Sequence, residues 1–204
     1  RRPGRVGRGV EKFSVLRARQ AVERADIVLL VIDATAGVTA QDTHIAGLAM
    51  DAHKGLIIVA NKWDLLEGKE DPQEFSGRIL RRLPFLPWAP LSLVSAATGF
   101  NIEGLLDLAL EVAEARNYRV PTHELNLTMR QAFADHPAPA KGRRHLKLLY
   151  VTQAETSPPT FVFFVNDASL LHFSYQRYLE NTIRKRFGFE GTAIRLVFRS
   201  RAET

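Results

Sequence analysis

Two short polar segments carry residue types that can recognise a purine base. Asn61-Lys62-Trp63-Asp64 matches the pattern N-K-x-D and directly follows the apolar run 56–60. Ser95-Ala96-Ala97-Thr98-Gly99 matches S-A-x-T-G and follows the apolar run 91–94. Each pattern alone is weak evidence, because such short strings recur by chance. Their occurrence at the equivalent place after two successive apolar runs indicates guanine recognition.

The chemistry of guanine explains the first segment. One edge of the base presents two donors, N1–H and the exocyclic N2 amine, and a carboxylate such as that of Asp64 accepts both at once. Asn61 can bridge the N7 side of the base and tie the two segments together. The alkyl stem of Lys62 can lie across the ring face while its ammonium stays in water. Adenine would leave the Asp64 carboxylate unmatched, and an unmatched buried polar group costs about 1–3 kcal/mol.

The second segment supplies backbone donors. We assign Ser95, Ala96 and Ala97 to guanine binding, with N–H groups near Ala96 meeting O6, an acceptor that adenine lacks. The alternative is that residues 61–64 form a polar turn after a strand, which the coincidence of the two segments disfavours. We expect Trp63 to pack rather than to stack on a base. Asp33, after the apolar run 27–32, could touch a switch or a cation or could cap a loop.

The segments that must position these residues alternate between strand and helix. Apolar, β-branched runs predict strands buried on both faces of a parallel sheet, at 27–33, 56–60 and 91–94. Helical spacing predicts helices at 13–26, 39–53, 72–82 and 102–115. Asp71 is the expected cap of the third helix, with Pro72 in its first turn. This alternation predicts an α/β fold with an open, doubly wound sheet that binds ligands at the carboxyl ends of its strands.

The sequence contains neither a G-x-x-x-x-G-K-[ST] phosphate loop nor a D-x-x-G segment that senses Mg²⁺ and the γ-phosphate. The Arg- and Gly-rich opening, residues 1–9, cannot replace the phosphate loop, because it lacks the Lys-Ser/Thr pair and an upstream strand. We therefore expect the first strand, the phosphate loop and the Mg²⁺ ligands upstream of Arg1. Residues 1–10 are then the tail of a switch loop, with an RNA-binding Arg/Gly tract as the alternative.

The excess of positive charge belongs to the last part of the chain. Residues 1–117 contain 15 Lys+Arg and 15 Asp+Glu, whereas residues 118–204 contain 13 and 7, which accounts for the net charge of +6. A helical stretch ends near Arg116, Pro121 follows it, and Thr122 is a candidate cap for the next helix. We therefore place a domain boundary between residues 117 and 118. The charge favours a phosphate-rich partner for residues 118–204.

The basic segment reads as a small two-layer α+β unit. Helices are predicted at 125–136 and 170–187, and strands at 145–153, 160–166 and 193–198. The order α-β-β-α-β is that of RNA-binding modules of the KH type, which clamp the backbone with a G-x-x-G loop between two helices. Gly188-Phe189-Glu190-Gly191 matches these letters but lies between a helix and a strand, so we interpret it as a helix C-cap and turn.

Four basic residues gather along or near the end of the second helix of this unit. They are the candidate RNA contacts: Arg177, Arg184, Lys185 and Arg186. Basic residues at this place also favour the helix dipole without any partner. Composition excludes other classes of function: the chain has no Cys, and therefore no disulfide framework, no Cys-ligated zinc and no thiol chemistry. The longest apolar run is too short to cross a bilayer, so we expect a cytoplasmic protein with no membrane partner.

Strings of residues along the whole chain resemble one family. They are 11–17 (EKFSVLR), 28–33 (VLLVID), 61–64 (NKWD), 95–99 (SAATG), 158–161 (PPTF), 164–167 (FVND), 172–175 (HFSY), 177–181 (RYLEN) and 187–191 (FGFEG). The chain resembles the EngA/Der family of bacterial tandem-GTPase ribosome-assembly factors. The nucleotide motifs are common to most GTPases, whereas the strings after residue 118 are particular to this family.

The resemblance implies two consecutive G domains followed by a KH-like domain. On that pattern, residues 1–117 are the second G domain, an incomplete doubly wound P-loop GTPase domain, and residues 118–204 are the small α+β KH-like domain. The implied cofactors are GTP/GDP and Mg²⁺, and the implied partners are ribosomal RNA and the large ribosomal subunit. The complete protein is expected to hydrolyse GTP during ribosome biogenesis. The chain by itself, with no catalytic residue assigned, is expected to be inactive; a non-enzymatic RNA- or ribosome-binding module is the alternative.

Overall fold

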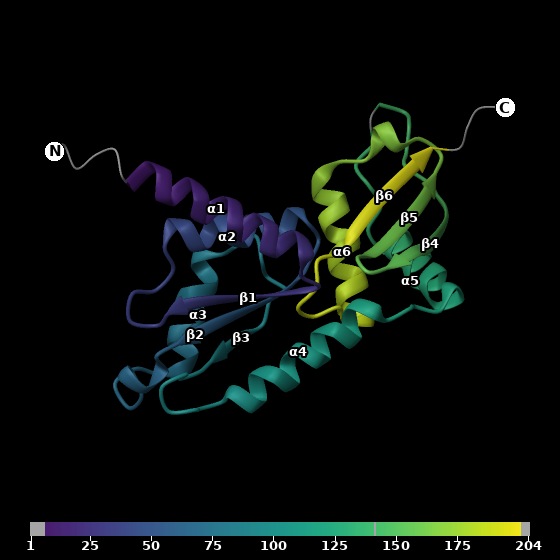
Figure 1. Cartoon of the computed structure of the whole chain (residues 1–204). Coiled ribbons are helices and arrows are strands. Elements are labelled where there is room, and N and C mark those ends of the chain that lie inside the picture. The colour runs from purple at the N-terminus through teal and green to yellow at the C-terminus, as the bar shows by residue number, and fades with distance from the viewer. Residues whose placement is uncertain (1–6, 141, 201–204) are drawn as a thin grey trace. The chain divides into compact units, whose positions relative to one another are not determined.

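The computed structural model describes residues 7–140 and 142–200, with side chains described from residue 16 onward (Figure 1). The chain divides into two compact units, unit 1 (Arg1–Ala113) and unit 2 (Glu114–Thr204). The division falls inside the helix that ends at Asn117, a little before the expected boundary between residues 117 and 118. Among the described helices, none has both the length and the apolar character needed to cross a membrane.

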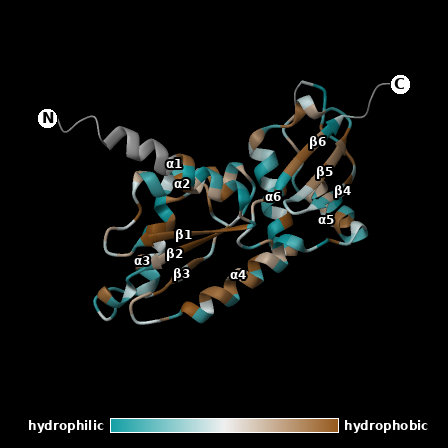
Figure 2. Ribbon diagram, in the orientation of Figure 1, coloured by the Kyte–Doolittle hydropathy of each residue, from teal (hydrophilic) through white to brown (hydrophobic). Residues whose placement is uncertain are grey.

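Unit 1 alternates helix and strand as the apolar periodicity predicts. Its elements are α1 (Gly7–Arg24), β1 (Ile27–Asp33), α2 (Ala40–Asp51), β2 (Gly55–Asn61), the 3₁₀ turn η1 (Trp63–Leu65), α3 (Pro72–Arg82), β3 (Leu91–Leu93) and α4 (Ile102–Asn117). The three strands form a parallel sheet in the order β1-β2-β3. Figure 2 shows β1 and β2 largely hydrophobic, which is the character of strands in a parallel sheet.

The expectation of a loop over residues 1–10 is wrong from Gly7 onward, because α1 begins there. Residues 1–6 lie outside the described residues. Extending an existing helix adds one hydrogen bond for each residue fixed, so a helix nucleated by residues 13–24 can propagate through the glycines that precede it.

Two apolar clusters hold the sheet of unit 1 on its two faces. One face packs Leu30 and Ile58 against helices α1, α2 and α3, through residues such as Val22, Ala46 and Phe75. The other face packs Ile57, Val59 and Val94 against Leu105 and Val112 of α4.

The second face is incompletely covered beside β1. The register places Leu29 of β1 next to Ile57 and Val31 next to Val59, so both point to the α4 face. Leu29 is 41% exposed and Val31 56%, and Leu106 and Leu110 of α4 are also exposed. A parallel strand normally has both faces covered, so the β1 edge of this sheet has the character of an interior strand.

Unit 2 has the α-β-β-α-β order expected from the sequence. Its elements are α5 (Thr122–Asp135), β4 (Leu148–Thr156), β5 (Pro159–Val165), the 3₁₀ turn η2 (Ala168–Leu170), α6 (Phe173–Phe187) and β6 (Arg195–Ser200). The sheet order is β4-β5-β6, with β4 antiparallel and β6 parallel to β5. Helices α5 and α6 bury Leu125, Met129, Leu179 and Ile183 against this sheet.

Helices α5 and α6 of unit 2 begin and end in different ways. Thr122 is not the cap of α5: it is the first helical residue, and Pro121 precedes it without a side-chain cap. The fixed φ of Pro121, −58°, already suits the entry into a helix, so the helix begins one residue earlier. Gly188 is the C-cap of α6 with φ +85°, and residues 188–191 therefore form the predicted cap and turn.

Candidate functional site

The two polar segments meet at one edge of the sheet of unit 1. Residues 61–64 follow β2, and residues 95–99 follow the end of β3, which pairs in parallel with β2. Parallel strands bring their carboxyl ends to the same edge, so the loops are neighbours because of the topology. The N–H of Trp63 donates to the carbonyl of Val94 at 3.0 Å, which fixes the start of one loop against the start of the other.

Asn61 joins the two loops directly, as the sequence analysis anticipated. Its side-chain Oδ1 accepts a hydrogen bond from the backbone N–H of Ala96 at 2.9 Å. This bond orients the Asn61 amide and positions the exposed backbone of Ala96 and Ala97. The Ala96 N–H is thereby engaged within the protein, so an O6 contact by this group requires the Asn61 bond to be shared with the base or exchanged for it.

Asp64 and Ser95 form the second link between the loops. The Ser95 hydroxyl donates to Asp64 Oδ1 at 2.5 Å, and the Ser95 side chain is fully buried. The same hydroxyl oxygen accepts from the N–H of Thr98 at 3.3 Å, which ties the turn to this pair. A short hydrogen bond to a carboxylate is among the stronger polar contacts, so Ser95 holds the Asp64 carboxylate in one orientation.

Lys62 adopts a backbone conformation that its neighbours must maintain. Its φ is +67°, in the left-handed region where a non-glycine residue is under strain that costs about 1–3 kcal/mol. The next residue, Trp63, is buried and packs edge-on against Phe75 with ring centroids 5.1 Å apart, so it has the predicted packing role. Burial of Trp63 and the link of Asn61 to Ala96 hold Lys62 in place between them.

The strained backbone places the Lys62 ammonium against Asp33 at the end of β1. Lys62 Nζ lies 2.6 Å from Asp33 Oδ2, and Asp33 also accepts hydrogen bonds from the N–H and hydroxyl of Thr35. Lys62, first of all, and then Thr35 hold the pKa of the Asp33 carboxyl far below its usual range. Asp33 raises the pKa of Lys62 in return.

Of the two roles left open for Asp33, the structure shows the loop cap, together with a pairing to Lys62 that sequence reasoning missed. The signal was present, because Asp33 and Asn61 pair across β1 and β2 and end at the same sheet edge.

This arrangement has the donors and acceptors that guanine needs. The Asp64 carboxylate, the Asn61 amide and the loop backbone at Ala96 lie at one edge of the sheet. Asp64 and Asn61 are each already hydrogen-bonded to the neighbouring loop. No group of three or more metal-ligating side chains lies together anywhere in the portion whose side chains are described.

The four basic residues of α6 fall into two classes. Arg184 is not a surface cation: its side chain is 13% exposed, it pairs with Glu180 at 2.8 Å, and its guanidinium donates to the carbonyls of Phe189 and Thr192. Burial lowers the pKa of Arg184, which Glu180 counteracts. Arg184 therefore holds the turn after α6. Because its guanidinium donors are used inside the fold, we no longer expect it to contact RNA.

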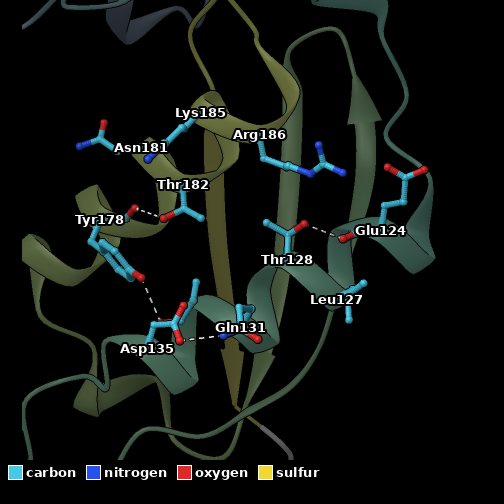
Figure 3. A pocket seen from close by; sticks show the side chains of 11 residues that line it. Glu124, Leu127, Thr128, Gln131, Asp135, Tyr178, Asn181, Thr182, Lys185 and Arg186 are labelled. Atoms are coloured by element: carbon cyan, nitrogen blue, oxygen red, sulfur yellow. Dashed lines mark hydrogen bonds between the residues drawn. The ribbon is translucent and has the colours of Figure 1, made fainter.

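The other three basic residues are exposed. The Arg177 guanidinium lies over the ring of Phe173, 5.6 Å from its centroid. Lys185 and Arg186 lie on a groove of about 810 Å³ between α5 and α6, which Figure 3 shows from close by. The α5 side of the same groove carries Glu124 and Asp135, so its charge is mixed.

Comparison with known proteins agrees with both units. Residues 9–115 match the model of the elongation factor Tu GTP-binding domain, and residues 119–199 match that of the KH-domain-like, C-terminal domain of EngA bacterial GTPase enzymes. The GTPase Der of Thermomicrobium roseum is 52% identical over 204 residues, covering 98% of this chain and 44% of that protein. The GTPase Der of Chloroflexus aggregans is 49% identical over 203 residues, covering 98% of this chain and 45% of that protein.

The chain thus spans a little under half the length of these curated relatives. Among solved structures, Aquifex aeolicus Era bound to GDP·AlF4⁻ is 18% identical with a TM-score of 0.41, covering 89% of this chain and 67% of that one, a likeness too low to bear on function. The two family models and the whole-chain identity near 50% carry the assignment instead. The chain belongs to the EngA/Der family of bacterial GTPases.

Proposed function

We propose that the chain supplies the guanine-recognition part of a cytoplasmic GTPase that acts in maturation of the large ribosomal subunit. Asp64 accepts the N1 and N2 donors of guanine, Asn61 faces the N7 side, and Lys62 covers the base. Ser95, Ala96 and Ala97 form the opposite side of the base pocket. The observation that carries this proposal is the double link of the loops, Asn61 to Ala96 and Ser95 to Asp64, at the carboxyl edge of the sheet.

GTP hydrolysis is assigned to the complete protein. The phosphate-loop pattern G-x-x-x-x-G-K-[ST] does not occur in these 204 residues. We propose that the complete G domain adds a further parallel strand beside β1 and holds phosphates and Mg²⁺ next to that edge. The exposed Leu29 and Val31 support this addition, because a strand and helix placed there would cover them.

We propose that unit 2 binds ribosomal RNA, which makes it the docking part of the molecule. The support is the net charge of +6 confined to residues 118–204 and the KH-like order of elements. As the chain stands alone, this RNA- or ribosome-binding role is the activity that its own residues favour.

The guanine assignment is tested by Asp64→Asn in the complete protein. Xanthine has a carbonyl where guanine has the N2 amine, so an Asn amide that donates there should favour it. We expect guanosine nucleotide affinity of this site to fall at least about ten-fold, since a hydrogen bond to a charged group contributes about 1.5–3 kcal/mol. Xanthosine diphosphate binding, measured by calorimetry, should appear in the variant.

Calorimetry with xanthosine diphosphate measures the new binding directly. Any other guanine site in the complete protein is unaltered and should not bind this nucleotide, so it does not obscure the result. Asp107→Asn, which makes the same chemical change at an exposed position on α4, is the matched control and should leave selectivity unchanged. If Asp64→Asn retains full preference for guanosine nucleotides, the assignment of Asp64 is wrong.

A further inference from the structure

The sheet of unit 2 has one face in the core cluster and a second face on which Tyr150 and Arg199 are exposed. Phe161, Phe163 and Val165 of β5 belong to the core cluster that α5 and α6 cover, and Phe198 of β6 stacks on Phe163. Strand residues alternate between faces, so Phe164 and Arg199 point to the opposite side. The residues that alternation assigns to that side, such as Tyr150, Phe164 and Arg199, lie outside the described core cluster. Thr160 and Val162 on the same side are nevertheless buried within the sheet.

An aromatic stack stands on this exposed face. Tyr150 and Phe164 are cross-strand partners whose rings lie 4.2 Å apart at an interplanar angle of 13°. Tyr150 is 47% exposed and β4 is the edge strand, so the open end of the two-ring stack is on the Tyr150 side. The Tyr150–Phe164–Arg199 row continues onto β6, where Arg199 is the partner of Phe164.

Positive charge gathers at the same end of the sheet. β4 begins where β5 and β6 end, since Leu148 pairs with Val165 and Val165 with Ser200. The exposed Arg143 and Lys147 lie in the segment that leads into β4, within residues 142–147. Arg144 in the same segment pairs with Asp167 at 3.1 Å, and this acid therefore offsets Arg144.

The acid on β4, Glu155, lies at the opposite end of the strands from the Tyr150–Phe164–Arg199 row. Glu155 is the partner of Thr160, which also pairs with Arg195. Glu155 and Arg195 therefore both lie away from Tyr150, one on each side of Thr160. The stack end of the exposed face remains basic, in contrast to the groove between α5 and α6, where Glu124 and Asp135 oppose Lys185 and Arg186.

We propose that the Tyr150–Phe164–Arg199 row, with Arg143 and Lys147 beside it, is a binding surface for single-stranded RNA. An unpaired base continues the aromatic stack on Tyr150, and Arg199, Arg143 and Lys147 contact the phosphates on either side of it. This inference rests on the proposed function of unit 2 in RNA binding and names the surface that performs it.

Single-stranded RNA is the occupant that both features fit. Aromatic side chains bind unpaired bases of any sequence by stacking, and flanking cations bind the backbone. A duplex has no free base face to stack on Tyr150. Binding of a nucleic-acid backbone to these cations should weaken steeply as salt rises, which binding of a protein to the same surface would not be expected to do. This surface also provides RNA contacts without a G-x-x-G loop between helices.

The test uses the 204-residue chain and a short, labelled oligouridine, with binding followed by fluorescence anisotropy over a series of KCl concentrations. Tyr150→Thr removes the ring in a strand-compatible way, and we expect affinity to fall about five-fold or more. Tyr150→Phe keeps the ring and should bind as the parent does. Arg199→Gln should reduce the slope of log affinity against log salt by about 0.7, the value for one phosphate contact on a single strand.

The matched control for charge is Arg130→Gln, at an exposed position on α5, which should leave the salt slope unchanged. Circular dichroism verifies that each variant folds, and the Arg199→Gln slope decides the question if Tyr150→Thr does not. If the parent binds the oligomer but Tyr150→Thr and Arg199→Gln behave like Arg130→Gln, this surface is wrong while RNA binding by unit 2 stands. If the parent binds duplex RNA as tightly as the oligomer, or binds duplex RNA alone, this surface is wrong while RNA binding by unit 2 stands. If it binds neither RNA, both proposals are wrong.

Discussion

Ser95 connects the fold of unit 1 to its candidate chemistry at the scale of one residue. Its hydroxyl is fully buried and serves at once as donor to Asp64 and as acceptor from Thr98. Loss of the hydroxyl leaves a carboxylate without its orienting partner and a backbone N–H without its acceptor. A side chain that merely filled space would have neither consequence.

We predict that Ser95→Ala lowers the free energy of unfolding of unit 1 by about 1.5–3 kcal/mol, because a charge-assisted bond is removed. Both tryptophans, Trp63 and Trp88, lie in unit 1, so denaturant unfolding followed by tryptophan fluorescence reports on this unit. Ser76→Ala is the control, since that hydroxyl donates to the carbonyl of Pro72 in an exposed hydrogen bond of α3, and its effect should stay within about 0.5 kcal/mol. Equal effects of the two variants would refute the role given to Ser95.

Single residues also show where reasoning from sequence reaches its limit. The type and place of Asn61, Asp64 and Ser95 were enough to anticipate that the loops meet, although their binding of guanine stays a prediction. Arg184 could not be assigned in that way, because a basic residue at a helix end looks the same in sequence whether its guanidinium faces water or the turn that follows. Only the fold brings the carbonyls of Phe189 and Thr192 to it.

At the scale of elements, α3 shows local sequence determining local structure. Its predicted bounds, 72–82, match the structure, and Asp71 caps it by accepting from the N–H groups of Gln73 and Glu74, both at 2.9 Å. Phe75 and Ile79 then direct the helix onto the sheet. Cap, proline and apolar spacing all favour the same helix, which is why its bounds could be predicted.

We predict that Asp71→Ala lowers the free energy of unfolding of unit 1 by about 0.5–2 kcal/mol, the usual cost of losing an N-cap. Thermal unfolding monitored by tryptophan fluorescence measures the change. Asp107→Ala, an acid-to-alanine change at an exposed position in the interior of α4, should alter stability by no more than about 0.5 kcal/mol. A loss as large in Asp107→Ala as in Asp71→Ala would show that removal of charge, and not of the cap, is responsible.

At the scale of the whole molecule, the chain consists of two units with different charge and different cores. The neutral one carries the linked loops after β2 and β3, and the basic one carries a three-stranded sheet with an exposed face. Because the two units have separate cores, each has a free energy of unfolding of its own. Both tryptophans lie in unit 1, so tryptophan fluorescence follows the unfolding of that unit. Far-UV circular dichroism reports on both units, so a transition that tryptophan fluorescence does not follow belongs to unit 2.

We predict that Arg184→Gln destabilises unit 2 alone, by about 2–3 kcal/mol, because a mostly buried, hydrogen-bonded cation is lost and Glu180 is left unpaired. The transition seen by circular dichroism should shift while that seen by tryptophan fluorescence stays in place. Arg186→Gln, on the exposed neighbour, is expected to shift neither by more than about 0.5 kcal/mol. If both variants leave the stability of unit 2 unaltered, the structural role given to Arg184 is wrong.

The sequence by itself determined the alternation of elements, the two loops that meet at the sheet edge, the KH-like order and the family. Those features depend on local periodicity, caps and short motifs, which neighbouring residues carry. The tertiary structure alone decided which polar groups find partners: Lys62 with Asp33, Arg184 with the turn after α6, and Tyr150 with Phe164 in the same row as Arg199. These pairings join residues that strand register brings together or that a turn folds back, and no local pattern encodes such contacts.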